Sequence, residues 1–181
     1  DALGLGNVRL LAASITDVDA SFGTFDYILT HGVYSWVPNA VQEKILAICA
    51  EQLAPRGVAY VSYNTLPGWR MRGMIRDLMR YHAMGFGEPD QRVAQARAIL
   101  DFLARWVPTE NNAYGLLLKS ETEGLRRQPD HYILHEYLED TNEPLYFHEF
   151  AERASRHGLL YLAEAEFNTM LASNFPPEVG D

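Results

Sequence analysis

The first third of the chain contains short apolar runs on either side of one amphipathic segment. Residues 7–14 and 25–31 are nearly continuously apolar, which is typical of buried strands. Between residues 39 and 53 the apolar side chains recur at helical spacing, which predicts a helix. A further strand is predicted at 57–65, a stretch rich in Val and Tyr. Strand, helix and strand joined by short links predict a βαβ unit with parallel strands.

The middle of the chain has helical periodicity and little strand signal. Helices are predicted at 70–82, 90–106, 112–126 and 131–138. The segment 88–138 is therefore expected to be an inserted helical subdomain.

The alternation of helix and strand resumes after this segment. A helix is predicted at 147–157, where Gly158 provides a stop signal. A fourth strand is predicted at 159–167. The fold class expected from the pattern is α/β.

Composition narrows the choice of partners and compartment. The chain has 181 residues, a formal net charge of -9 and a pI of about 5.1, which argues against nucleic acid as a partner. No apolar run reaches membrane-spanning length, so no membrane insertion is expected. The single cysteine, Cys49, excludes an internal disulfide and favours a reducing, cytoplasmic location. Because the chain starts at Asp1 and ends without an evident terminal element, we expect a piece of a larger protein.

Polar and aromatic residues follow three of the predicted strands. The stretches are Ser14–Asp17, His31–Trp36 and Tyr63–Trp69. In an open α/β sheet, ligands bind beyond the carboxyl ends of the parallel strands, so these loops are the candidate site. Gly32 would allow a close approach of the backbone to a ligand. The alternative is that the aromatic side chains merely cover the end of the sheet.

Two other clusters have less specific explanations. His131 and His135 share a helix face at a spacing that can serve zinc, but no HExxH pattern or cysteine cluster accompanies them. No metal is therefore predicted. Arg72, Arg76 and Arg80 form a stripe that could pair with the acidic segment 135–143 or hold an acidic substrate, although a solvated face is the preferred interpretation.

Three stretches carry a resemblance to a known family. "HGVYSWVP", "SYNTLPGW" and "EPLYFHEFAERASRHGLLYLAE" are similar to bacterial class I S-adenosylmethionine-dependent methyltransferases that carry a methyltransferase regulatory domain. This group includes protein-lysine methyltransferases. The resemblance implies a Rossmann-like sheet, S-adenosylmethionine as cofactor and methyl transfer to a nucleophilic acceptor. It favours protein lysine as the acceptor, while small molecules and lipids remain alternatives.

The chain also departs from the family pattern. The glycine-rich loop after the family's first strand and the acidic residue after its second strand are both missing, so the resemblance covers the C-terminal half of the sheet. Since those two strands lie between the third and fourth in the family, 7–14 and 25–31 are not expected to be neighbours. The Asp that often ends the third strand is matched by Ser14. The motif of DNA and glutamine methylases is replaced by "THGVY", which argues against those substrates.

The resemblance assigns expected roles to nine residues. Ser14 and Ile15 are expected on the adenine side of the cofactor, with His31 and Gly32 also binding it. His31 is the predicted general base and Tyr34 the second catalytic residue, although a packed structural role for His31 is equally open. The predicted substrate-binding residues are Trp36, Tyr63, Asn64 and Trp69, whose aromatic members could face a cation.

The resulting domain division has three parts. Residues 1–87 and 139–181 are assigned to the methyltransferase core, and 88–138 to an inserted regulatory or dimerisation segment that could form a homodimer. Two alternatives from another functional class stay open. The chain could be a regulatory or protein-interaction module, or a degenerate methyltransferase fold that only binds a protein.

Overall fold

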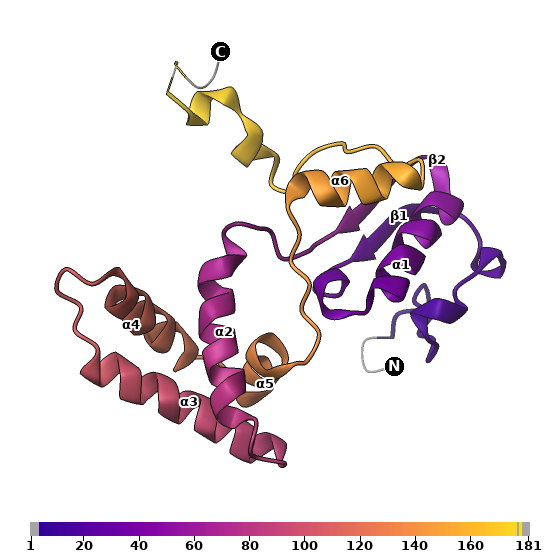
Figure 1. The fold of residues 1–181 in the computed structure, drawn as a ribbon. Helices are drawn as coiled ribbons and strands as arrows, with labels where there is room; N and C mark the ends of the chain where they lie inside the picture. Colours follow the sequence, from indigo (N-terminus) through magenta and orange to yellow (C-terminus); the bar gives the residue numbers. More distant parts are fainter. Residues whose placement is uncertain (1–3, 177, 179–181) are drawn as a thin grey trace. The chain divides into compact units, whose positions relative to one another are not determined.

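The computed structural model describes residues 4–176 and residue 178, which form two compact units (Figure 1). The sheet unit joins the residues up to Tyr63 with those from His148 onward. The helical unit is Asn64–Phe147. The coarse α/β class is confirmed.

The sheet unit is built on the predicted βαβ element. Its described residues contain a two-stranded sheet of β1 (Phe25–Thr30) and β2 (Leu53–Val61), connected by helix α1 (Asn39–Gln52). The strands are parallel, as predicted, with Thr30 opposite Val61. β2 begins and ends earlier than the predicted strand 57–65, so the helix passes directly into the strand.

Gly57 allows the two strands to approach closely where their register is irregular. The register shifts between Phe25 and Tyr27. A Cβ atom added to Gly57 would lie 3.0 Å from the carbonyl oxygen of Phe25 and 2.8 Å from the Cδ2 atom of Leu53. Any larger residue would therefore push the strand or the Leu53 side chain away.

α1 supplies most of the buried apolar side chains of the sheet unit. Ile45, Leu46, Ile48 and Cys49 are all buried, so Cys49 belongs to the core. Burial raises the pKa of the Cys49 thiol to about 11. Helix α6 (Phe147–Arg156) contacts α1 through polar side chains described below.

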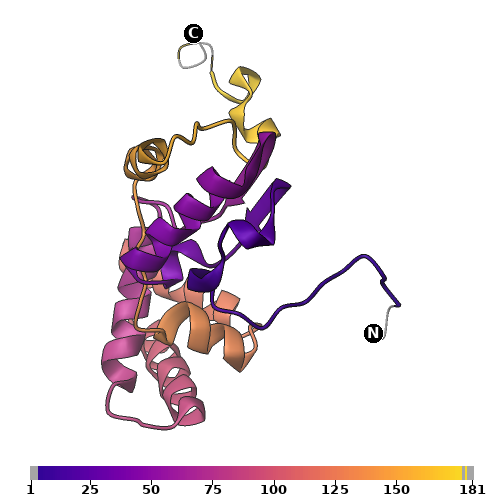
Figure 2. The same ribbon diagram turned by 90° about the vertical axis from the view of Figure 1, so that its right-hand side faces the viewer.

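The predicted strand at 7–14 is wrong. These residues form an extended segment without strand pairing (Figure 2), and Leu10 is 90% exposed. The short helices η1 (Ile15–Asp17) and η2 (Ala20–Phe22) follow. A strand needs a neighbour to satisfy its backbone N–H and C=O groups, and the described residues give this segment none.

The predicted strand at 159–167 is wrong for the same physical reason. Leu160 is 91% exposed, and the segment leads into the short helices η4 (Phe167–Met170) and η5 (Ala172–Asn174). Apolar sequence alone predicted strands at both places, but pairing decides whether strands form.

The helical unit contains α2 (Trp69–Ala83), α3 (Pro89–Trp106), α4 (Ala113–Leu125) and α5 (Asp130–Leu138). The four helices pack around a common core (Figure 1). Its fully buried members, each at most 1% exposed, are Ile75, Met79, Ala83, Ala96, Leu100, Leu118, Ile133, Tyr137 and Leu138. The unit is wider than the predicted segment 88–138, because α2 packs against α3 and α5.

The arginine stripe on α2 pairs with the acidic segment 135–143 rather than facing solvent. Arg72 lies 3.4 Å from Glu136, and Arg80 lies 2.7 Å from Asp140. Arg76 is 5% exposed and donates to the carbonyl oxygen of Glu139. The preferred interpretation of a solvated face was therefore wrong, and the pairing alternative is confirmed.

Candidate functional site

The loop after β1 is fixed at its base by two contacts with β2 and the residue that follows it. The Nδ1 atom of His31 lies 3.0 Å from the hydroxyl oxygen of Tyr60, and their rings stack with centroids 5.8 Å apart. The backbone N–H of Gly32 donates to Ser62 Oγ over 2.7 Å. These contacts follow from parallel pairing, because the carboxyl ends of both strands meet at the same edge of the sheet.

Gly32 has the backbone conformation that a glycine is best suited to adopt. Its φ is +68°, in the left-handed region. A Cβ atom at Gly32 would have no other heavy atom within 4 Å, so the space beside this backbone is open. The prediction that Gly32 permits close approach of a ligand is compatible with this geometry.

The loop then turns inward at η3 (Tyr34–Trp36). Tyr34 is 0% exposed. Its ring meets the Phe150 ring edge-on at 5.4 Å and the Tyr63 ring at 6.5 Å, and Phe150 and Tyr63 stack at 4.3 Å. Of the two predicted catalytic residues, His31 is exposed to solvent and Tyr34 is buried in this aromatic cluster.

Ser14 and Ile15 lie at the start of η1, which packs along α1. The Ser14 hydroxyl caps this short helix by accepting from the backbone N–H of Thr16, and it lies 2.7 Å from the Thr16 hydroxyl. Both residues belong to the sheet unit, together with His31, Gly32, Tyr34, Trp36 and Tyr63. Their binding roles stay predictions.

The predicted substrate residues Asn64 and Trp69 belong to the helical unit. The Asn64 carbonyl oxygen accepts from the backbone N–H of Leu145 over 3.0 Å. The Trp69 indole N–H donates to Asn142 Oδ1 over 2.8 Å, and the guanidinium of Arg72 lies 5.4 Å from the centroid of the indole. The cation that Trp69 meets in this structure is therefore a residue of its own unit.

Sequence reasoning missed Gln42, Phe150 and Arg153, which surround the buried end of the loop. Gln42 and Arg153 are polar residues in amphipathic helices, where a solvated position is the usual assignment. Only the long-range packing of α6 against the loop reveals their contacts. The available signal in the sequence was the family resemblance of the stretch "EPLYFHEFAERASRHGLLYLAE", which contains α6.

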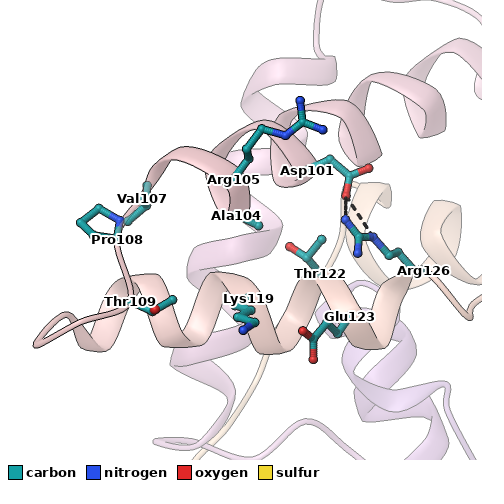
Figure 3. Close-up of a pocket in the computed structure, with 10 residues that line it drawn as sticks. All are labelled: Asp101, Ala104, Arg105, Val107, Pro108, Thr109, Lys119, Thr122, Glu123 and Arg126. Carbon is teal, nitrogen blue, oxygen red and sulfur yellow. Dashed lines mark hydrogen bonds and ion pairs between the residues drawn. The ribbon is translucent and has the colours of Figure 1, made fainter.

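A surface groove of about 580 Å³ lies between α3 and α4, and its lining contains none of the predicted site residues (Figure 3). Its charged lining includes Arg105 and Lys119, and Arg126 pairs with Asp101 over 2.7 Å. The lining holds three cationic and two anionic side chains, so the groove has no marked preference for a ligand of one charge.

Neither a metal-binding cluster nor a membrane-spanning helix is found in the described part of the chain. In residues 4–176 and 178, no three or more His, Cys, Asp or Glu side chains are grouped so that they could hold a metal ion. In the same residues, no helix has both the length and the apolar character needed to cross a membrane.

Comparison with known proteins gives matches over almost the whole chain. A family model described as a predicted methyltransferase regulatory domain matches residues 129–181. Protein RP789 of Rickettsia prowazekii (strain Madrid E) is 47% identical over 98% of this chain and 32% of its own length. Protein RP028 of the same organism is 43% identical over 83% of this chain and 60% of its own length.

A solved structure, PKMT2 from Rickettsia typhi in complex with AdoHcy, has the same fold over this region. It is 42% identical, with a TM-score of 0.82, over 96% of this chain and 33% of the PKMT2 chain. The chain thus spans about a third of the length of RP789 and of PKMT2. The expected resemblance is confirmed: this chain is similar, over nearly all its length, to part of a larger methyltransferase and carries a match to a methyltransferase regulatory domain.

Proposed function

We propose that this chain is part of an S-adenosylmethionine-dependent methyltransferase whose acceptor is a protein lysine. The observation that carries the proposal is the 42% identity to PKMT2, a protein lysine methyltransferase with AdoHcy bound. AdoHcy is the molecule left when S-adenosylmethionine has given up its methyl group. In this proposal β1, α1 and β2 are the C-terminal part of a Rossmann-like sheet.

The cofactor-binding residues of this proposal lie in the sheet unit. The open space beside the positive-φ backbone of Gly32 supports a role in close approach to the cofactor. Ser14 and Ile15 are proposed to lie on its adenine side. When bound, S-adenosylmethionine supplies an electrophilic methyl group on a sulfonium, while the protein supplies alignment and electrostatics.

His31 is proposed as the general base. A lysine ammonium must lose a proton before it can act as a nucleophile, and imidazole has the pKa range for this task. If Nδ1–H donates to the Tyr60 hydroxyl, the Nε2 lone pair is the one that accepts the substrate proton. The Tyr60 contact supports a fixed ring orientation, and the hydroxyl can either accept from Nδ1–H or donate to Nδ1.

The proposed substrate contacts in the sheet unit are the aromatic rings of Trp36 and Tyr63, which suit a cationic lysine side chain. Tyr34 is proposed to support them from its buried position. The predicted roles of Asn64 and Trp69 remain separate proposals, each tested by substitution to Ala and measurement of the acceptor KM.

The test is calorimetric titration of S-adenosylmethionine, combined with transfer of a labelled methyl group to lysine-containing protein. Both are done with the chain as given and with a protein extended to the length of its relatives. We expect binding and transfer by the extended protein, and a loss of about 10²-fold or more in turnover for His31→Ala. His82→Ala, which changes a histidine in α2, should keep full turnover. Absence of cofactor binding by the extended protein would contradict the proposal.

A second candidate function is a regulatory or protein-interaction module without chemistry of its own. The match of residues 129–181 to a regulatory-domain model favours it. The helical unit would then contact a partner protein or form a homodimer. Mass measurement by sedimentation equilibrium tests the homodimer, and a monomer at all concentrations would exclude that form of the proposal.

A further inference from the structure

Gln42 is a fully buried amide that contacts the loop after β1 at two points. It is 0% exposed. Its Nε2 atom donates to the carbonyl oxygen of Tyr34 over 2.9 Å and to that of Val37 over 3.3 Å. These two carbonyls bracket η3, so one side chain fixes both ends of the short helix that carries Tyr34 and Trp36. A buried amide of this kind specifies a single loop conformation when all its groups are paired.

The carbonyl oxygen of the Gln42 side chain is hydrogen-bonded to Arg153 of α6. Its Nη1 atom donates to Gln42 Oε1 over 2.7 Å. A guanidinium has donors and no acceptor, so Oε1 must face Arg153 and Nε2 must face the loop carbonyls. Arg153 therefore sets the amide orientation that the loop requires.

α6 has other contacts with the same region. Phe150 meets Tyr34 and stacks on Tyr63, and His157, just beyond the end of α6, lies 2.9 Å from Glu43. All these residues belong to the sheet unit. α6 also lies within residues 129–181, the part that matches the regulatory-domain model.

We propose that Gln42 is a positioning residue through which α6 holds the loop from Gly32 to Val37 in its conformation. When α6 is docked, Arg153 orients the Gln42 amide and the loop is ordered. When α6 is displaced, the amide can rotate and the loop loses its two hydrogen bonds from Gln42. The regulatory segment thereby controls the geometry of the candidate site, a statement that rests on the proposed function.

Two substitutions test separately the contact of Gln42 with the loop and its contact with Arg153. Gln42→Glu keeps an acceptor for Arg153 but replaces the amide donor by an oxygen that faces the carbonyls of Tyr34 and Val37. Arg153→Met keeps the Gln42 donors but removes the group that orients them. Arg156→Met is the matched control on the same helix, because Arg156 is exposed and pairs with Glu152 at the helix surface.

Hydrogen exchange of the loop is the direct measurement and needs no activity. The Trp36 N–H, which donates to the carbonyl oxygen of Val33 over 2.9 Å, is the reporter. We expect its exchange to rise about tenfold in Gln42→Glu and in Arg153→Met, as for the loss of one buried hydrogen bond. Amides of α1 from Ile45 onward, and the whole pattern in Arg156→Met, should stay within about twofold of wild type.

Two results would overturn the proposal. One is unchanged exchange at Trp36 in both variants. The other is an equal increase throughout α1 and β1, which would mean general destabilisation instead of loop release. Because Arg153→Met leaves a neutral, apolar side chain at a half-buried position, it provides the decision if Gln42→Glu fails to fold.

Turnover of the extended protein tests whether the loop contacts affect activity. We expect kcat/KM for the acceptor to fall about tenfold in both variants, while Arg156→Met matches wild type. If the wild-type protein neither binds S-adenosylmethionine nor transfers methyl groups, the proposed function fails while the exchange result still decides the role of Gln42. Normal turnover in a variant with a released loop would overturn the link between α6 and the site.

Discussion

The rings of Phe150 and Tyr63 stack with their centroids 4.3 Å apart and an interplanar angle of 20°. The two residues are far apart in the sequence, so the stack joins α6 to the end of the β2 region. Aromatic pairs of this kind contribute beyond the area they bury. The stack is therefore expected to be a main anchor of α6.

Phe150→Ala should lower the free energy of unfolding of the sheet unit by about 2 kcal/mol, because it removes both the stack and the edge contact with Tyr34. Denaturant unfolding monitored by near-ultraviolet circular dichroism measures this change. Phe167→Ala is the control, since Phe167 is 63% exposed and should change stability by less than about 0.5 kcal/mol. Equal effects of the two substitutions would show that the stack does not anchor α6.

The α/β class, the parallel βαβ element and the helical character of the middle segment could all be predicted from local pattern. The reason is physical: helices satisfy their own backbone groups, so the amphipathic repeats of α1 and α3 suffice to identify them. Local pattern could not show whether residues 7–14 and 159–167 form strands, since a strand exists only with a neighbour.

The candidate site, too, could be predicted from the sequence only in part. The positions of His31 and Gly32 after a strand, and the open backbone at Gly32, follow from sequence and topology. The burial of Tyr34 and its contacts with Phe150 depend on how α6 packs, which no local pattern encodes. Likewise, the pairing of Arg80 with Asp140 needed the fold of the helical unit to decide between three sequence-based alternatives.

Arg97 connects the end of α4 to the start of α5. Its guanidinium donates to the carbonyl oxygens of Leu125 and Gln128 at 2.8 and 2.7 Å and pairs with Asp130 at 2.8 Å. Arg97→Ala should cost about 2–3 kcal/mol of the unfolding free energy, because the last carbonyl of α4 and a carbonyl of the following turn lose a charged donor. Arg97→Lys should recover only part of this, since one ammonium cannot reproduce the fork.

Thermal and denaturant unfolding measure the stability of the wild-type protein, Arg97→Ala and Arg97→Lys. Arg105→Ala is the control. Arg105 is an exposed arginine on the same helix, so its loss should change stability by less than about 0.5 kcal/mol. If Arg97→Lys is as stable as wild type, the multiple contacts of the guanidinium do not contribute to stability.

Two glycines of α4 should respond oppositely to the same substitution. A Cβ atom at Gly115 would overlap the backbone carbonyl oxygen of Pro108, whereas at Gly124 nothing lies within 4 Å. Gly115→Ala should therefore be destabilising by several kcal/mol, because backbone must move. Gly124→Ala should be stabilising by about 0.5–1 kcal/mol, the difference in helix propensity. Differential scanning calorimetry gives both signs, and a stable Gly115→Ala protein would contradict the close packing of the segment before α4.

Cys49 should be unreactive in the folded protein. The thiol is 0% exposed, and burial raises its pKa to about 11 from the 9.0 of an ordinary cysteine thiol. The thiolate is the nucleophile, so labelling by a disulfide reagent at pH 8 should proceed only through unfolding. The rate should then increase with denaturant in step with the unfolded fraction. Rapid labelling in buffer alone would mean that α1 opens locally.

The Cys49 thiol should also make the stability of the protein depend on pH. The folded state holds the Cys49 proton more tightly than the unfolded state, whose thiol titrates near 9. The stabilisation is therefore complete below pH 9 and is lost progressively as the pH rises from 9 towards 11, by up to about 2 kcal/mol. Other groups titrate in this range, so the comparison with Cys49→Ala isolates the effect. The unfolding free energies of the two proteins should converge as the pH rises from 9 towards about 11, and a constant difference would exclude linkage to this thiol.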